Sequence, residues 1–466
     1  MTGIGSVIPT TLWNKIWTNQ RKKAVFLALQ TNPNLNNQII YELSVQNLTE
    51  QHNFQGVIDD LDRIQALGVD VVWLMPIHPR GEKMRLGPCG SPYSVRDFRA
   101  INPAYGDFDD FARLVDAIHA RGMKVMLDIV YNHTSQDSVL VTEHPEFFYR
   151  DENGQPMYRF WNDVYDLDYR NEALCDYMVE TALMWARLGV DGYRCDVAPM
   201  VPMSFWTRAR REMDALNPDF IWLAETHHYP FLTKMRDRGW NLHSDCEMYQ
   251  AFDITYDYDV HYFYEDYLKG KGTLKQYVDG LNRQKAMYPM NYIKMRFLEN
   301  HDQARVCSLV HTDEQLRMWT AFCYFLKGPA LIYAGQEFME AKRAMTAGPD
   351  AIGRREVPWL MELFQQLRGV KKLPIVRDGA FFLDDPEQDS ILTGRYELGD
   401  ELLLGAFNFH LVTGTARLPL PDGEYENLLG GTVTVKDGCI PAPMTPVLIH
   451  VTGQSVERKA FKEHEG

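Results

Sequence analysis

The chain lacks several features that would assign it to a membrane, extracellular or nucleic-acid-binding class. No segment approaches the roughly 18 consecutive apolar residues of a membrane helix. Lys and Arg number 48 against 63 Asp and Glu, and the resulting net charge of −15 disfavours nucleic acid as a partner. The seven cysteines are odd in number and form no C-x-x-C pair, which indicates free thiols in a reducing compartment. Because the N-terminus has no basic start followed by an apolar stretch, we expect a cytoplasmic protein.

Two kinds of apolar pattern alternate along most of the 466 residues. Strands are predicted at 39–43, 69–76, 124–130, 190–195, 219–224, 243–249, 293–298 and 329–333. Apolar residues at helical spacing predict helices at 54–67, 108–118, 171–188, 202–214, 272–285, 312–326 and 357–370. Eight strands that alternate with helices favour a parallel (β/α)8 barrel, the TIM barrel fold.

The barrel pattern is interrupted at defined places, which sets the predicted domain boundaries. Residues 1–37 are an N-terminal extension with a helical stretch at 11–30, and the barrel is expected to span 38–372. Within it, residues 134–169 are too long for an ordinary loop and are rich in Tyr, Phe, Trp and Asp, which predicts a small inserted domain over the barrel top. Short β-like runs predict a C-terminal β-sandwich domain at 373–452, followed by a charged, frayed tail at 453–466.

Four carboxylates lie near the ends of predicted strands. Asp128 is near the end of the third strand, Asp196 follows the fourth, Glu225 the fifth and Asp302 the seventh. A carboxylate at the end of an apolar strand is costly unless it is paired or has a function. Any one of them alone could be a capping or ion-pair residue, but a set at several strand ends indicates an active site, because these ends meet at one face of the barrel.

The spacing around two of these acids suits glycosidic bond cleavage, in which one acid protonates the leaving group and another attacks the sugar. Arg194 and Asp196 are two residues apart and therefore face the same side of a strand, where the guanidinium favours the ionised carboxylate of a nucleophile. Cys195 faces the other way and is expected to pack in the core. Glu225 follows the apolar run 220–224, and an apolar wall raises the pKa of a carboxyl, as a general acid requires.

Over residues 38–452 the chain resembles the α-amylase family of retaining glycoside hydrolases. The resemblance is carried by four motifs in the family's order: DIVYNH at 128–133, GYRCD at 192–196, AE at 224–225 and ENHD at 299–302. Each motif alone is weak evidence, but four in order are specific. The residues after the nucleophile, Val197 and Ala198, are closest to the intracellular neopullulanase, cyclomaltodextrinase and α-glucosidase-like members.

The resemblance implies a role for each site residue. Asp196 would be the nucleophile that forms a β-glycosyl-enzyme intermediate, Glu225 the acid and base, and Asp302 the carboxylate that binds sugar hydroxyls in the transition state. The implied substrate-binding and supporting residues are Tyr93 under the sugar, His133 and His301 on its hydroxyls, Arg194 beside the nucleophile, and Asp128 behind the site.

The chain also departs from the family pattern near the site. Many secreted α-amylases have Lys-His where this sequence has Pro199 and Met200, and that His contributes to a calcium site. Asn132 is retained, so the resemblance leaves a calcium near Asn132 open, although no cofactor is otherwise required. His227 and His228 follow the acid, and the sequence fits equally a contact on the leaving-group side and a solvent-exposed loop.

The resemblance implies hydrolysis of α-1,4-linked malto-oligosaccharides or short α-glucans, with such a glucan as the partner. An α-glucanotransferase or a phosphorylase would use the same intermediate, and an α-1,6-acting glucosidase shares the motifs, so these alternatives remain open. A catalytically inactive scaffold or transporter partner is disfavoured, because all three carboxylates are present and no membrane segment is expected. A metal-centred barrel enzyme lacks support, since no ligand cluster has metal-binding spacing. The oligomeric state is left open.

Overall fold

The computed structural model describes residues 31–343, 346–348, 350–386 and 388–453. The helix expected within 11–30, most of the predicted N-terminal extension and nearly all of the predicted tail therefore lie outside the described residues.

Eight parallel strands form one sheet in the order β10-β1-β2-β3-β6-β7-β8-β9. Their bounds are β1 (Ile39–Leu43), β2 (Val71–Leu74), β3 (Lys124–Ile129), β6 (Gly192–Cys195), β7 (Ile221–Ala224), β8 (Ile254–Tyr256), β9 (Lys294–Met295) and β10 (Ala330–Tyr333). A parallel bridge between Arg296, just after β9, and Ala330 of β10 joins the two ends of the sheet. The predicted TIM barrel is confirmed.

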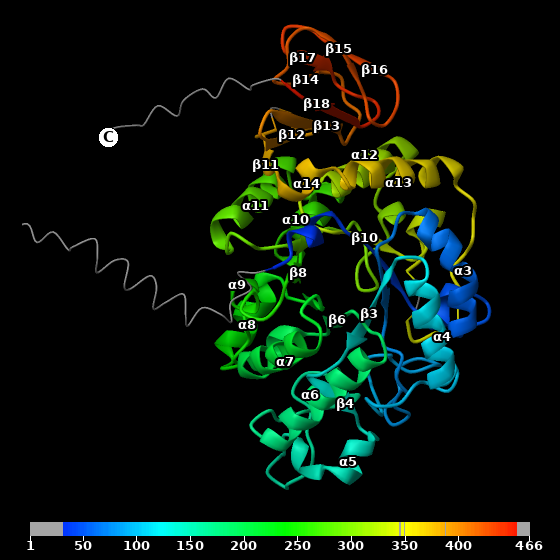
Figure 1. The fold of residues 1–466 in the computed structure, drawn as a ribbon. Coiled ribbons are helices and arrows are strands. Elements are labelled where there is room, and N and C mark those ends of the chain that lie inside the picture. Colours follow the sequence, from blue (N-terminus) through cyan, green and yellow to red (C-terminus); the bar gives the residue numbers. More distant parts are fainter. Residues whose placement is uncertain (1–30, 344–345, 349, 387, 454–466) are drawn as a thin grey trace, which may run out of the picture.

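Helices follow most of these strands and surround the barrel (Figure 1). The α-helices are α2 (Val45–Leu48), α3 (Phe54–Ala66), α4 (Phe108–His119), α5 (Val139–Glu143), α6 (Glu172–Arg187), α7 (Met203–Leu216), α8 (Tyr229–Asp237), α9 (Asp245–Met248), α10 (Tyr258–Leu268), α11 (Leu274–Met287), α12 (Asp313–Phe325), α13 (Pro358–Lys371) and α14 (Pro374–Asp378). Short 3₁₀ turns are η1 (Pro33–Asn37), η2 (Pro145–Phe147), η3 (Ala198–Met200), η4 (Val306–Ser308) and η5 (Gln336–Phe338).

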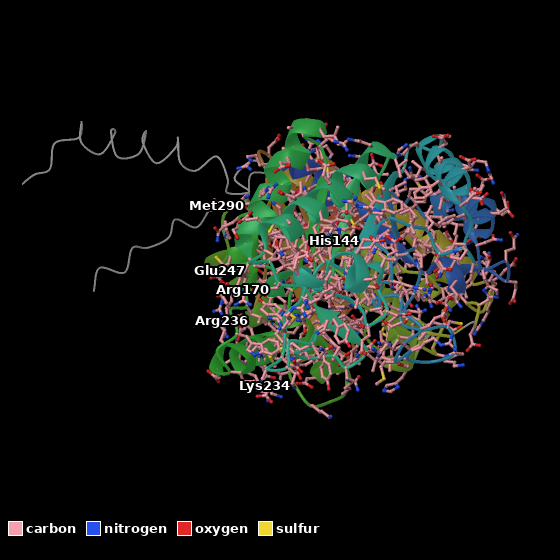
Figure 2. All side chains as sticks on the ribbon, turned by 90° about the horizontal axis from the view of Figure 1, so that it is seen from below. His144, Arg170, Lys234, Arg236, Glu247 and Met290 are labelled. Carbon is pink, nitrogen blue, oxygen red and sulfur yellow. The ribbon has the colours of Figure 1, made fainter. Side chains whose placement is uncertain are left out.

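The sixth barrel strand lies elsewhere than predicted. The sequence analysis placed it at 243–249, but these residues include the short helix α9, and the strand is β8 at Ile254–Tyr256. The reason is local, because Ser244 and Glu247 form a reciprocal capping box that starts a helix. Helix α8 was not predicted either. The two helices are joined by an ion pair of 2.7 Å between Arg236 and Glu247, which lie on the same side of the molecule in Figure 2.

Alternating side chains of the barrel strands divide between two cores. The inner core is filled by large apolar residues, among them Trp73, Met126, Leu223, Tyr256, Met295, Phe297 and Leu331. The outward-facing residues pack against the helices in a much larger cluster, which includes the buried Cys195 as the alternation predicts.

Two parts depart from the barrel repeat and lie at opposite ends of the molecule in Figure 1. Between β3 and β6 the chain makes an excursion that contains the antiparallel pair β4 (His133–Ser135) and β5 (Val164–Asp166) as well as α5. The C-terminal part is all β. Its four-stranded antiparallel sheet is β11 (Ala380–Leu383), β12 (Ile391–Leu398), β13 (Glu401–Asn408) and β18 (Val447–Val451). Two antiparallel pairs complete it: β14 (Thr415–Arg417) with β17 (Cys439–Pro441), and the hairpin of β15 (Gly423–Glu426) with β16 (Thr432–Val435), which lies between them in the chain.

The seven cysteines all fall within the described residues and all are free thiols. Among the helices that the structure describes, none combines the length and the apolar character needed to cross a bilayer.

Candidate active site

Arg194 lies at the centre of a buried group of acids at the C-terminal ends of the barrel strands. Its Nη1 is 2.8 Å from Oδ1 of Asp128 and 3.0 Å from Oδ1 of Asp196, and its Nη2 is 3.0 Å from Oε2 of Glu225. Its Nε donates to the hydroxyl of Tyr256 over 3.0 Å. The guanidinium is fully buried, so one fixed cation contacts three acids that come from three neighbouring strands.

Strand register places these groups together. Asp128 of β3 pairs with Arg194 of β6, and Arg194 pairs in turn with Leu223 of β7. Asp196 is two residues beyond Arg194 and therefore faces the same side, while Glu225 is the residue that directly follows β7. The predicted convergence of the strand-end carboxylates thus follows from the parallel register of adjacent strands.

Burial dominates the protonation of the two central acids. It raises the pKa of Asp196 and of Glu225 to about 7 each, against the opposing effect of the Arg194 charge. Arg194 favours the ionised form of Asp196, as the sequence predicts, but desolvation outweighs it and the pKa of Asp196 rises. The charge of Asp196 adds to the rise in the pKa of Glu225, and a raised pKa is what a general acid requires.

The contacts of Glu225 indicate which of its oxygens suits a proton in the acid form. Oε2 accepts a hydrogen bond of 2.7 Å from the backbone N–H of Val197 and lies 3.0 Å from Nη2 of Arg194. An oxygen that accepts this hydrogen bond and lies beside the Arg194 cation is the less favourable of the two for a proton. Oε1 is therefore the oxygen that is available to protonate a substrate.

Asp302 and His301 form the mouth of the site. The Asp302 side chain is 43% exposed, its Oδ2 is 3.3 Å from Nε2 of His301 and its Oδ1 is 3.5 Å from Nη2 of Arg343. Burial raises the pKa of Asp302, but the positive charges of His301, Arg194 and Arg343 outweigh it and lower the pKa overall. The ring of Tyr93 stacks on the His301 imidazole at 5.4 Å, and its hydroxyl lies 2.8 Å from Nε2.

A cavity of 260 Å³ connects these groups, and its walls include six of the predicted site residues: Tyr93, His133, Asp196, Glu225, His301 and Asp302. Arg194 and Asp128 are fully buried behind that wall. His133 is also buried, its Nε2 lies 4.0 Å from Oδ2 of Asp196, and burial lowers its pKa. The structure thus brings together all eight residues that the sequence indicated.

Other residues of the cavity wall were not predicted. Trp161, from the excursion, lies with its ring 5.2 Å from the His133 imidazole, and Leu86, Asp163 and Val164 also line the cavity. The aromatic content of 134–169 was visible in the sequence, but no pattern singles out one ring among the others. For the two histidines after the acid, the structure decides between the interpretations. His227 lines the cavity, while the following histidine is exposed.

The surroundings of Asn132 do not fit calcium. Both oxygens of Asp166 already accept hydrogen bonds, Oδ2 from the backbone N–H of Arg159 at 2.5 Å and Oδ1 from its guanidinium at 3.3 Å. The amide nitrogen of Asn132 also lies 3.3 Å from that Oδ1. Calcium requires six to eight oxygen ligands, and no group of three or more His, Cys, Asp or Glu suited to a metal occurs in the described part of the chain.

The barrel, the acid pair at its strand ends and the carboxylate at its mouth define the class of barrel enzymes that cleave glycosidic bonds with two carboxylates. The sequence profile of the α-amylase catalytic domain matches residues 40–154 and 143–357, and that of the bacterial α-amylase C-terminal domain matches residues 382–449. The chain belongs to the α-amylase family.

Similar proteins of known structure cover nearly the whole chain. An α-amylase from Lactobacillus plantarum is 44% identical, with a TM-score of 0.87 over 90% of this chain and 100% of that protein. A noncanonic maltogenic α-amylase from Thermotoga neapolitana is 35% identical, with a TM-score of 0.81 over 90% and 99%. The intracellular maltogenic amylase of Bacillus subtilis is 27% identical over 345 residues, 70% of this chain. This chain spans 55% of that protein, 64% of α-amylase 2 from Dictyoglomus thermophilum and 44% of α-amylase MalA from Haloarcula japonica.

Proposed function

We propose that the protein hydrolyses α-1,4-linked malto-oligosaccharides or short α-glucans through a covalent glycosyl-enzyme intermediate. The observation that carries the proposal is the position of Arg194 between Asp128, Asp196 and Glu225, directly behind the wall of a cavity whose mouth holds Asp302. The similarity to an α-amylase and to maltogenic amylases supports the choice of an α-glucan as the substrate.

In the first step, Oδ2 of Asp196 attacks the anomeric carbon, because Oδ1 is held by Arg194. Oε1 of Glu225 gives its proton to the glycosidic oxygen as the bond between that oxygen and the anomeric carbon breaks. The shortened glucan leaves with the proton, and the sugar remains bound to Asp196 as an ester. In the second step, Glu225 takes a proton from water, the water oxygen bonds to the anomeric carbon, and Asp196 is released as a carboxylate.

A transferase or phosphorylase would differ only in the second step, where a sugar hydroxyl or phosphate replaces water. The catalytic residues are the same for each acceptor, so the products must decide. An α-1,6-acting glucosidase is the other alternative, and the relative named neopullulanase 2 from Thermoactinomyces vulgaris, 28% identical over 351 residues, is the observation in its favour.

The products of maltoheptaose and pullulan over time test the proposal. We expect shorter maltosaccharides, with one new reducing end for each bond cleaved. Products longer than maltoheptaose without new reducing ends would identify a transferase instead, and glucose 1-phosphate formed only in the presence of phosphate would identify a phosphorylase. Cleavage of pullulan would extend the substrate range to α-1,6 links or to the α-1,4 links next to them. No cleavage of any α-glucan would refute the proposal.

Chelation of calcium is expected to leave the enzyme unchanged. The cation next to Asp166 is the guanidinium of Arg159, which a chelator cannot remove. Activity and melting temperature should therefore agree with and without EDTA. Replacement of Arg159 by Ala should lower the free energy of unfolding by about 1–3 kcal/mol, because the buried Asp166 loses a donor. Loss of activity in EDTA that added calcium restores would contradict this assignment.

We also propose that the protein acts inside the cell. Seven free cysteines suit a reducing compartment, and the similar Bacillus subtilis amylase is described as intracellular.

A further inference from the structure

A buried glutamate that belongs to none of the predicted site residues lies directly behind the candidate site. Glu42 is in β1, near its C-terminal end, and its side chain is fully buried. Its Oε1 contacts Nδ1 of His301 at hydrogen-bond distance. Its Oε2 has no hydrogen-bond partner among the residues that the structure describes. Burial of a carboxylate oxygen that accepts no hydrogen bond costs free energy. The contact of the other oxygen with His301 therefore requires an explanation.

The other side of His301 faces a chain of hydrogen bonds. Nε2 lies 2.8 Å from the hydroxyl of Tyr93, and that hydroxyl donates to Oδ2 of Asp128 over 3.0 Å. Oδ1 of Asp128 in turn accepts from Nη1 of Arg194 over 2.8 Å. Since the Tyr93 proton points to Asp128, the Tyr93 oxygen can only accept from His301. Nε2 of His301 therefore carries a proton.

The same argument applies at Nδ1. Glu42 offers a carboxylate oxygen there, which as an ionised acceptor requires a proton on Nδ1. With protons on both nitrogens, the ring of His301 is an imidazolium. The aromatic neighbours fix its orientation, because Tyr93 stacks on one face at an interplanar angle of 19° and Trp73 meets the ring edge-on at 86°.

The charges around the ring agree with this assignment. Burial lowers the pKa of His301, but the negative charges of Asp302 and Glu42 and the hydrogen bond to Glu42 outweigh it and raise the pKa to about 9. Arg194 is the cation that acts in the opposite direction. Glu42 and Asp302 thus stabilise the positive charge of the His301 ring from opposite sides. Of the two acids, Glu42 is the one that a substrate cannot reach.

We propose that Glu42 is a positioning residue that holds His301 as an imidazolium with a fixed orientation. The consequence at the mouth of the site is that His301 presents an N–H to Asp302 and to sugar hydroxyls, and that its charge keeps Asp302 ionised as an acceptor. Glu42 touches no substrate and acts only through His301. The part of this inference that concerns catalysis rests on the proposed function, whereas the protonation of His301 does not.

The first test is a nitrogen-15 NMR titration of the histidine rings in the parent protein. The His301 signals are assigned by their loss in His301→Asn. We expect His301 to remain an imidazolium up to about pH 8, well above the ordinary histidine pKa of about 6.5. A neutral ring at pH 7 would overturn the proposal. This result needs neither activity nor a folded variant at position 42, so it stands or falls separately from the proposed function.

The second test removes the negative charge of residue 42 and keeps the shape of its side chain. Glu42→Gln should lower the pKa of His301 by about 1–3 units, since an opposite charge in contact contributes about that much. Glu337→Gln is the matched control, because Glu337, in the turn η5 after β10, is also fully buried but contacts Tyr41 and Arg63 instead. The control should leave the His301 titration unchanged. An unchanged His301 titration in Glu42→Gln would refute the role of Glu42.

The kinetic test follows from the titration. The test compares kcat/KM on maltoheptaose between Glu42→Gln and the parent. At pH 7.5 the variant should be about tenfold slower, which corresponds to a His301 pKa about one unit below the assay pH. At pH 5.5, where the ring is protonated again, the ratio of the two values should return toward one. A merely structural role would lower the ratio equally at both values of pH, and that outcome would contradict the proposal.

Discussion

Replacement of Asp196 by Asn is expected to abolish turnover while the protein becomes at least as stable as the parent. The amide cannot form the ester intermediate, and kcat on maltoheptaose should fall by more than about 10⁴-fold, beyond the loss of a general acid alone. Stability should not suffer, because burial raises the pKa of Asp196 to about 7 and thus makes its ionised form unfavourable in the folded protein. The activity assay and a thermal melt at pH 8 check both halves.

The pH dependence of this stabilisation has a definite sign. A carboxyl whose pKa is raised on folding favours the folded state fully below its unfolded pKa of about 4, and this contribution is lost as the pH rises through its folded pKa of about 7. The stability advantage of Asp196→Asn should therefore be largest above pH 7 and vanish toward pH 4.

A buried acid outside the site provides the control. Asp253 is 3.0 Å from Arg210, accepts from the backbone N–H of Trp222 over 3.0 Å, and has a pKa that burial raises. Asp253→Asn should keep kcat near that of the parent. Near-parent activity of Asp196→Asn on every α-glucan tested would remove Asp196 from the role of nucleophile.

Glu225→Gln separates the acid from the nucleophile. It should lose activity on malto-oligosaccharides by about 10²–10⁴-fold, the usual contribution of a general acid. With α-maltosyl fluoride, whose leaving group needs no proton, the first step should persist and the glycosyl-enzyme should accumulate, visible by mass spectrometry as a covalent adduct. The absence of an adduct on Glu225→Gln, together with equal losses on both substrates, would assign the proton transfer to another residue.

Arg194→Met is expected to lower both the activity and the free energy of unfolding by a large amount. The variant leaves Asp128, Asp196 and Glu225 buried without their common cation. Loss of one partner of a buried ion pair costs about 3–5 kcal/mol, and at neutral pH the free energy of unfolding should fall by at least that amount. The loss should shrink toward pH 5, because protonated carboxyls need no counter-charge. Urea unfolding at pH 8 and pH 5 measures both effects.

Arg305→Met is the matched control for this experiment. Arg305 is equally buried but pairs with one acid, Glu299, at 2.6 Å. Its loss should also destabilise the protein, with a shallower pH dependence because one carboxylate is left unpaired instead of three. If the unfolding free energy of Arg194→Met changed with pH no more than that of Arg305→Met, the central position of Arg194 would be refuted.

The sequence by itself determined the barrel and the acids of the candidate site. Parallel strands buried on both faces produce apolar runs that are easy to recognise, and the polar residues that follow them must gather where those strands end. Asp128, Arg194, Asp196 and Glu225 could be placed together on this basis, because adjacent parallel strands bring residues near their carboxyl ends into register.

Only the tertiary structure decided the remaining features, because they depend on contacts between segments far apart in the chain. The sixth strand, β8, is three residues long, and the segment 243–249 that precedes it contains a capped helix instead. Trp161 reaches the site from the excursion, and Arg159 engages Asp166 through a loop whose path no local pattern specifies. Glu42 lies 259 positions from its partner His301, and the two meet because closure of the barrel places β1 near the residues that follow β9. Side-chain spacing defines a strand and its faces, but only the closed sheet decides which distant charges share its interior.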